Sequence, residues 1–447
     1  MQIRPHHFVL GCAALFSSHG QAAVTAEEAA KLRGELTPLG AQRQGNKEGT
    51  IPAWTGAPTV IAGDKAGGRR GDPFKDEKPL YSVTARNMAQ HADKLTDGTK
   101  ALLTKYPDSF RLDVYKTYRT AIAPQWVYDN TAKNATQARL EKDVPVGAYG
   151  GIPFPIPKTG GEAIWNHLLR WRGVSWESQV NQYQITANGK VVLTSDATMK
   201  QNMPYYFEDG SLDTYRGFYW DINLVNAGPP IRAGEMLVGR ESFDTSKTST
   251  YIYLTGQRRV RKLPNACCDS PTPASAGVMS FDELQVWSGR TDRFDWKVLG
   301  KKEILVPYNS NRFLQAKESD LVTGQHLNPD HVRWELHRVW VVEAKLRAGE
   351  RHLAPRSVYY LDVDTWAAVL GDRWDAQNQL WKSLWTMSYV MPDLPGTVQQ
   401  TFGYYDLLSG LGYVANVLNE KAFHQRFTKR WPDEMFTGDG LASRGVR

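Results

Sequence analysis

Four basic side chains occupy five consecutive positions near the middle of the chain. They are Arg258, Arg259, Arg261 and Lys262, and they directly follow the aromatic run at residues 251–254 and its turn. Such a cluster commonly forms the solvated rim of a domain. It also suits a docking surface for anionic lipid headgroups or for an acidic protein partner. The sequence leaves both interpretations open.

Tryptophan is the second residue type that indicates binding chemistry. The chain has 15 Trp and 20 Tyr, whose wide, amphipathic rings suit apolar binding surfaces. Five tryptophans fall on the more apolar side of alternating runs, and we expect them to line a site for an apolar ligand: Trp220, Trp334, Trp340, Trp381 and Trp385. Arg338 falls on the same side of its run. It either extends to the rim or meets a ligand headgroup at the mouth of a cavity.

Motifs for catalysis and metal binding are missing from the sequence. There is no nucleophile elbow, phosphate-binding loop, zinc-protease helix or dinucleotide fingerprint. His326 and His331 flank a loop-like Asn-Pro-Asp turn, which does not preorganise a metal site. Glu162 and His167 fit a helix cap and a helix face better than an acid–base pair. We therefore expect no enzyme activity, no metal and no cofactor.

Two adjacent cysteines, Cys267 and Cys268, precede a proline-rich turn. Neighbouring α-carbons are about 3.8 Å apart, whereas a disulfide usually spans about 4.4–6.8 Å. A disulfide between them is therefore possible but strained, and two free thiols fit the sequence equally well.

Alternating apolar and polar residues predict that most of the chain after residue 175 is β-sheet. Residues 251–254 and 258–263 form one expected hairpin, and Asn188-Gly189 marks the turn of another. Residues 332–346 and 380–391 alternate over longer runs. About ten such strands, joined by short turns, indicate an antiparallel sheet that curls around its apolar face.

The N-terminal third has fewer strands and more helical patterns. Thr25 and Glu28 predict a capping box. Residues 40–79 are rich in Gly and Pro, and we expect them to form an ordered arm that packs over the core. Helices are expected at residues 84–95, 98–105, 131–142 and 162–170. We expect these helices to cover the open side of the curled sheet.

Several long runs together resemble one bacterial family. The runs are LTPLGAQRQGNKEGTIPAWTG, GGIPFPIP with GEAIWNHLLRWRG, YIYLTGQRRVRKLP and DRFDWKVLGKKEILVPYN. They resemble domain-of-unknown-function family 1329, which is related to periplasmic outer-membrane lipoprotein-sorting carriers of the LolA and LolB type. The resemblance implies a mainly β fold with α-helices, in which a half-open antiparallel β-barrel is covered by helices. It also implies an apolar cavity and a place beside lipid-transporting membrane proteins. The family has no agreed activity, so the resemblance assigns no catalytic residues.

The N-terminus has the pattern of a secretory signal peptide. Arg4 begins it, residues 8–16 form a short apolar run, and small residues lead to a cleavage site after Ala22 or Ala23. The apolar run is shorter than the roughly 20 residues that span a bilayer. Cys12 offers only a weak lipid-attachment pattern. We expect an exported, soluble periplasmic protein.

These features predict three segments and two alternative functions. The segments are a signal peptide at 1–22, an N-terminal arm with helices at 23–175, and an open β-barrel with a C-terminal extension at 176–447. The first function is a periplasmic carrier or chaperone for a lipid, an acyl chain or a sterol-like compound, which it exchanges with membrane transport proteins. The second is a non-enzymatic scaffold or assembly factor for an outer-membrane or transporter complex. The formal net charge of +7 favours anionic partners, and nothing indicates nucleic acid.

Overall fold

The computed structural model describes residues 24–264 and 266–445. The predicted signal peptide lies outside these ranges. A single 16-stranded sheet organises the described chain. Its strands are β1 (Tyr81–Val83), β2 (Leu112–Val114), β5 (Ser175–Ile185), β6 (Val191–Asn202), β7 (Phe218–Gly228), β8 (Met236–Ser242), β9 (Ser249–Leu254), β10 (Arg259–Lys262), β11 (Phe294–Pro307), β14 (Trp334–Leu346), β15 (Arg356–Asp362), β16 (Ala368–Trp374), β17 (Leu380–Met391), β18 (Gly396–Asp406), β19 (Gly412–Val417) and β20 (Gln425–Phe427).

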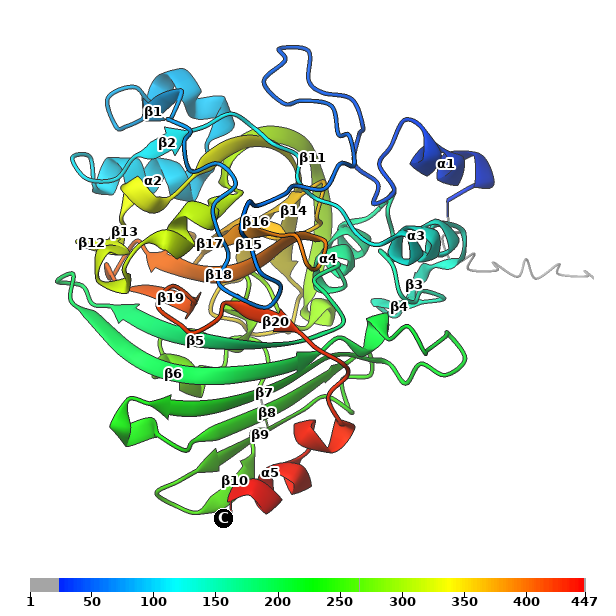
Figure 1. The fold of residues 1–447 in the computed structure, drawn as a ribbon, viewed down its shortest axis with the longest axis vertical. Coiled ribbons are helices and arrows are strands. Elements are labelled where there is room, and N and C mark those ends of the chain that lie inside the picture. The colour runs from blue at the N-terminus through cyan, green and yellow to red at the C-terminus, as the bar shows by residue number, and fades with distance from the viewer. Residues whose placement is uncertain (1–23, 265, 446–447) are drawn as a thin grey trace, which may run out of the picture.

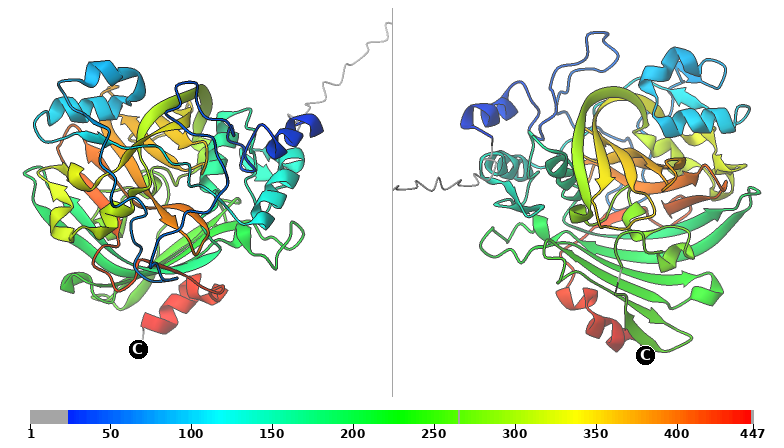
Figure 2. Two further views of the ribbon diagram at one scale, coloured as in Figure 1. Left: turned by 45° about the horizontal axis from the view of Figure 1, so that its top comes forward. Right: turned by 180° about the vertical axis from the view of Figure 1, so that it is seen from behind.

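The sheet curls without closing, as Figures 1 and 2 show. Its strand order is β1-β2-β14-β15-β16-β17-β18-β19-β5-β6-β7-β8-β9-β10, with β11 beside β14 and β20 beside β5. Neighbours are antiparallel except at the parallel contact between β2 and β14. The predicted curled, open antiparallel sheet is confirmed, with more strands than the ten expected.

The pairing of β19 with β5 joins the two halves of the sheet. Gly412 lies opposite Ile185, so a C-terminal strand completes a surface that begins in the middle of the chain. Both predicted hairpins are present. Gly189 turns between β5 and β6 with φ +81°, a value that glycine adopts without strain, and β9 pairs with β10.

The helices are α1 (Ala26–Ala30), α2 (Asp97–Lys105), α3 (Gln125–Gln137), α4 (Gly160–Leu168) and α5 (Gly438–Gly445). Capping boxes begin α1 at Thr25 and α4 at Thr159, where Glu162 completes the box. Two expectations were wrong. Residues 84–95 contain a 3₁₀ helix at Met88–Lys94. The helix expected at 131–142 begins earlier, after Pro124, and ends where β3 (Arg139–Glu141) and β4 (Val144–Val146) form a small hairpin.

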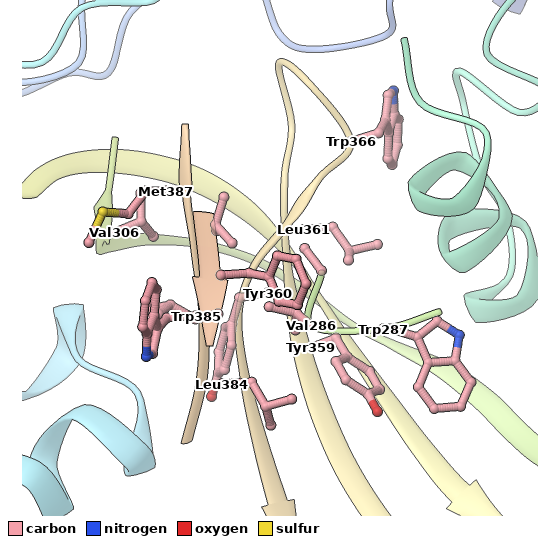
Figure 3. Close-up of a cluster of buried hydrophobic side chains, with 14 of the residues drawn as sticks. Val286, Trp287, Val306, Tyr359, Tyr360, Leu361, Trp366, Leu384, Trp385 and Met387 are labelled. Carbon is pink, nitrogen blue, oxygen red and sulfur yellow. The ribbon is translucent and has the colours of Figure 1, made fainter. Parts of the chain in front are cut away.

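Residues 266–290, here called the internal segment, pack against one face of the sheet. Two buried acids anchor it: Asp282 pairs with Arg373 of β16, and Glu283 pairs with Lys382 of β17 at 2.6 Å. Val286 and Trp287 pack beside Tyr359, on the opposite side of the strands from Trp385 (Figure 3). We call the sheet face that contacts this segment the inner face. The second half of the internal segment is therefore part of the core, whereas the proline-rich turn in its first half lies nearer the surface, with Pro271 exposed and Pro273 half-buried.

Strand β14 is buried on both faces, although its alternation predicted one polar face. Glu335 and His337 are 0% and 1% exposed, because residues 115–121 and the turn at Asn309 pack over them. Glu335 accepts hydrogen bonds from Arg333 (2.6 Å), His337 (3.0 Å) and the Tyr118 backbone (2.9 Å). The charges on this face therefore form a buried network rather than a solvated surface.

Candidate functional site

An apolar cavity of about 90 Å³, here called the Trp220 cavity, lies between the inner face of β5–β9 and the internal segment. The sheet contributes Met199, Trp220, Ile222, Leu224, Leu237 and Gly239, and the internal segment contributes Met279, Phe281, Leu284 and Gln285. Phe402 of β18 closes one side. The cavity is therefore built from strands of both halves of the sheet and from the segment they enclose.

Strand alternation and register produce this cavity. Trp220, Ile222 and Leu224 are alternate residues of β7 and share one face, as the sequence predicted. Ile222 lies opposite Gly239 of β8, and Gly239 lies opposite Thr250 of β9. Because Gly239 has no side chain, the centre of this wall is hollow.

A larger and more polar cavity of about 380 Å³ adjoins the first, since Glu241 and Thr250 line both. Its wall also includes Lys262, Arg290 and Arg293. Burial raises the pKa of Glu241 to about 8, so this carboxyl is mostly neutral at pH 7. Cys267 lines the same cavity, and both cysteines of the pair are free thiols. We call the larger cavity the outer chamber.

Two buried arginines lie behind the apolar cavity. Arg170 and Arg172 follow α4 and both donate hydrogen bonds to Oε1 of Gln285, which lines the cavity. The Arg172 guanidinium lies 5.1 Å from the centre of the Trp220 ring. One indole ring and one carboxamide therefore separate these cations from the cavity.

His167 has a structural position on α4. It is fully buried, its Nδ1 accepts from the Ala368 backbone N–H at 2.8 Å, and its Nε2 lies 2.8 Å from the Trp287 carbonyl oxygen. Burial, followed by the charge of Arg170, lowers its pKa well below the ordinary value, which leaves the ring neutral. The imidazole thus ties α4 to β16 and to the internal segment.

The other predicted tryptophans do not share the Trp220 cavity. Trp334 and Trp385 line a space of only about 20 Å³ under α2, where Phe110 and Met387 pack against them. Trp340 stacks on Trp366, with ring centres 6.2 Å apart. Trp381 donates its indole N–H to Asp406 at 3.0 Å. The structure therefore divides the five residues among separate environments.

The basic hairpin, Arg258 to Lys262 with its four cations, is exposed at the last strand of the sheet. Within the part of the chain that the structure describes, none of these four side chains is ion-paired, and Lys262 also borders the outer chamber. Charges on an edge strand also oppose edge-to-edge association. Arg338 lies elsewhere: it pairs with Glu303 at 3.0 Å and donates to the Gln44 carbonyl.

One cluster offers the residue types of a metal site. Ligand atoms of His337, Asp362 and Asp364 lie within 4.8 Å of one another, and all three residues are buried. Asp364 is already engaged by Arg119, whose Nε and Nη2 bind its two oxygens at 2.9 and 2.7 Å. Because the Arg119 guanidinium already binds both oxygens of Asp364, this cluster is a poor fit for a metal ion.

Among the residues in and behind this cavity, the sequence singled out Trp220 but not Glu241, Gln285, Arg170 or Arg172. The Arg-Trp-Arg run after an apolar helix was a usable signal for the last two, because paired cations are unusual in a buried stretch. Glu241 and Gln285 carry no local signal, since their burial depends on distant packing. Among the described helices, none is long and apolar enough to cross a membrane.

Comparisons with known proteins identify relatives. The sequence profile of a family described as a protein of unknown function, DUF1329, matches residues 82–442. The uncharacterized protein PA3922 of Pseudomonas aeruginosa is 37% identical, covering 97% of this chain and 96% of its own length. A solved outer membrane lipoprotein-sorting protein domain from Vibrio parahaemolyticus matches with a TM-score of 0.44 and 13% identity, over 63% of this chain and 97% of that one. A DUF1329 family protein from Desulfovibrio piger matches with a TM-score of 0.41 and 13% identity, over 60% and 92%.

Proposed function

The chain belongs to the DUF1329 family, and we propose that it is a periplasmic carrier for an apolar molecule such as a lipid, an acyl chain or a sterol-like compound. In this proposal it receives and delivers its cargo at membrane transport proteins. The observation that carries the proposal is the apolar cavity at Trp220, which adjoins a polar outer chamber. Small-molecule sites typically combine such an apolar wall with a few polar groups.

The size of the cavity limits what it holds in the closed state. An engineered apolar cavity of about 150 Å³ accommodates one benzene molecule, whereas this one measures about 90 Å³. A complete acyl chain therefore requires the internal segment to move. Asp282 and Glu283 anchor its second half through buried ion pairs, so we expect residues 266–279 to shift when cargo is admitted.

Titration with a neutral fluorescent dye tests the proposal. The dye N-phenyl-1-naphthylamine emits strongly only out of water, so its emission should rise on addition of the protein and fall when an acyl compound displaces it. Each buried methylene contributes about 0.8 kcal/mol, and association costs offset part of this gain. We expect micromolar dissociation constants. The absence of any rise in emission would contradict the carrier function.

We propose that the basic hairpin docks the carrier on an anionic membrane surface or on an acidic partner. Changing Arg258, Arg259, Arg261 and Lys262 together to Gln should leave the melting temperature near that of the wild type, because exposed charges contribute little to stability. The same variant should sediment less with vesicles containing phosphatidylglycerol, because about 1 kcal/mol of attraction is lost per cation near the surface.

A matched variant separates docking from net charge. Changing Lys47, Lys75, Lys78 and Lys133 to Gln removes the same charge from exposed positions elsewhere. Vesicle capture should then stay near the wild-type level. Equal loss of capture in both variants would show that the position of the hairpin does not matter.

A scaffold or assembly factor is the second candidate, and the internal segment favours it. Much of the inner face is filled by the chain itself: Tyr404 donates to the Val278 carbonyl, and Tyr413 donates to the Ala274 carbonyl. A filled interior suits a protein that acts through its surface. The dye titration separates the two functions, because a scaffold needs no cargo.

A further inference from the structure

Arg170 and Arg172 are buried cations without an anionic partner. They are 2% and 4% exposed, and among the described residues no Asp or Glu oxygen lies within 4.0 Å of either guanidinium. The similarly buried Arg119, Arg333 and Arg373 each have such a partner. The Nε atoms of Arg170 and Arg172 also lack a hydrogen-bond partner. These two residues therefore depart from the pattern of the rest of the core.

Such an arrangement is energetically unfavourable as it stands. A buried charge is costly unless a counter-charge and hydrogen bonds compensate for it. Burial, followed by repulsion from Arg172, lowers the pKa of Arg170. Burial also lowers the pKa of Arg172 to about 10. The Trp220 ring and the Gln285 oxygen offset part of this cost, but neither carries a negative charge.

Gln285 occupies the place that an anion would take. Its Oε1 accepts from both guanidinium groups, so one neutral oxygen serves two cations. Gln285 and Val286 have φ values of +52° and +73°, which lie in a backbone region that residues other than Gly and Asn rarely adopt. The same Gln285 lines the apolar cavity. A shift of this one residue would open the cationic pair to the cavity.

From this geometry we infer that the cargo is an acyl chain ending in a carboxylate, whose headgroup replaces the Gln285 carboxamide between Arg170 and Arg172. This inference rests on the proposed carrier function and specifies its ligand. A planar carboxylate matches the fork of a guanidinium group and accepts strong, charge-assisted hydrogen bonds. The chain would lie along Trp220, Ile222 and Leu224. Glu241 at the border of the cavity would not repel the headgroup at pH 7, because its raised pKa keeps it mostly neutral.

A purely structural role for the arginines makes a different prediction. In that case they only fasten the internal segment to the end of α4, where Arg170 also donates to the His167 carbonyl at 2.6 Å. Their loss would then lower stability without changing the choice between ligands of different charge. Ligand selectivity, rather than stability, therefore separates the two roles.

The test is displacement of N-phenyl-1-naphthylamine by dodecanoic acid and by 1-dodecanol at pH 7. The two compounds share a chain length and differ in headgroup charge. Wild-type protein should prefer the acid by at least about tenfold, since a buried charge pair contributes that much or more. Arg172→Met should remove the preference while dye binding persists. Arg86→Met, at an exposed position away from both cavities and from the basic hairpin, should leave it unchanged.

A second variant keeps the test decisive if Arg172→Met does not fold. Gln285→Glu places a fixed carboxylate beside both cations, so it should raise the melting temperature and abolish the preference for acid. An unchanged preference in Gln285→Glu, or equal displacement of wild type by acid and alcohol, would overturn the inference. Dye binding without acid preference would leave the carrier function standing, whereas failure to bind the dye at all would reject the carrier function itself.

Discussion

Gly239→Val should weaken ligand binding strongly while the protein stays folded. The change adds three carbon atoms at the centre of the cavity wall. A Cβ at this position would meet the Ile222 methyl at 3.2 Å and Thr250 Oγ1 at 3.5 Å. The residue lies in a strand, where valine is favoured, and its φ is not among the positive values of the chain. We expect dye affinity to fall by more than about tenfold, because overpacking and displacement of cargo each cost about 1 kcal/mol or more.

A matched glycine provides the control. Gly256→Val makes the same change in the exposed turn between β9 and β10, where no atom lies within 4 Å of the added Cβ. Its dye affinity should equal that of the wild type. If Gly239→Val binds the dye as tightly as Gly256→Val does, the dye does not bind in the Trp220 cavity.

Glu335→Ala should cause the largest loss of stability among single changes in β14. The carboxylate is fully buried and holds Arg333, His337 and Asn309 together. Its removal leaves buried positive charge without its nearest counter-charge, which typically costs about 3–5 kcal/mol. Urea unfolding followed by circular dichroism measures this cost. Glu343→Ala is the control on the same strand. Its partners Arg356 and Lys345 are partly exposed, with side-chain exposures of 35% and 64%, so we expect a loss below about 1 kcal/mol.

The difference between wild type and Glu335→Ala should depend on pH. Burial alone would raise the pKa of Glu335, but the hydrogen bond from His337 and the charge of Arg333 outweigh it and hold the pKa below its ordinary value. A depressed carboxyl pKa contributes stability above the unfolded-state pKa, about 4.3, and this contribution is lost as pH falls through the folded-state value. The stability gap should therefore be full at pH 7 and narrow below about pH 4. A gap that stays constant down to pH 3 would contradict the ionic role of Glu335.

Local alternation predicted the strands well. Trp220 was correctly assigned to the apolar side of its run, which it shares with Ile222 and Leu224, because successive side chains of a strand point to opposite faces. The same logic could not show that Trp385 faces α2 while Trp220 faces the internal segment. Alternation defines two faces in each strand, but it does not tell which face of one strand joins which face of a distant strand.

Long-range packing could not be predicted from the sequence. The internal segment contains Pro271, Pro273 and Gly277, residues typical of an exposed connector. Pro271 and Gly277 are indeed exposed, but the ion pairs of Asp282 and Glu283 hold the second half of the segment against strands about one hundred residues further along the chain. The closure of the inner surface by β19 beside β5 likewise depends on residues more than two hundred positions apart. The candidate cavity therefore could not be predicted from the sequence, whereas its β7 wall could.

Analysis of molecules that co-purify with the protein tests the carrier function most directly. Wild type, Gly239→Val and Gly256→Val are expressed in parallel, purified without detergent, extracted with organic solvent and compared by mass spectrometry. We expect one class of apolar compound that bears a carboxylate, present in wild type and Gly256→Val and depleted in Gly239→Val. Identical extracts from all three proteins, or no apolar compound in any of them, would contradict the assignment of the Trp220 cavity as a cargo site.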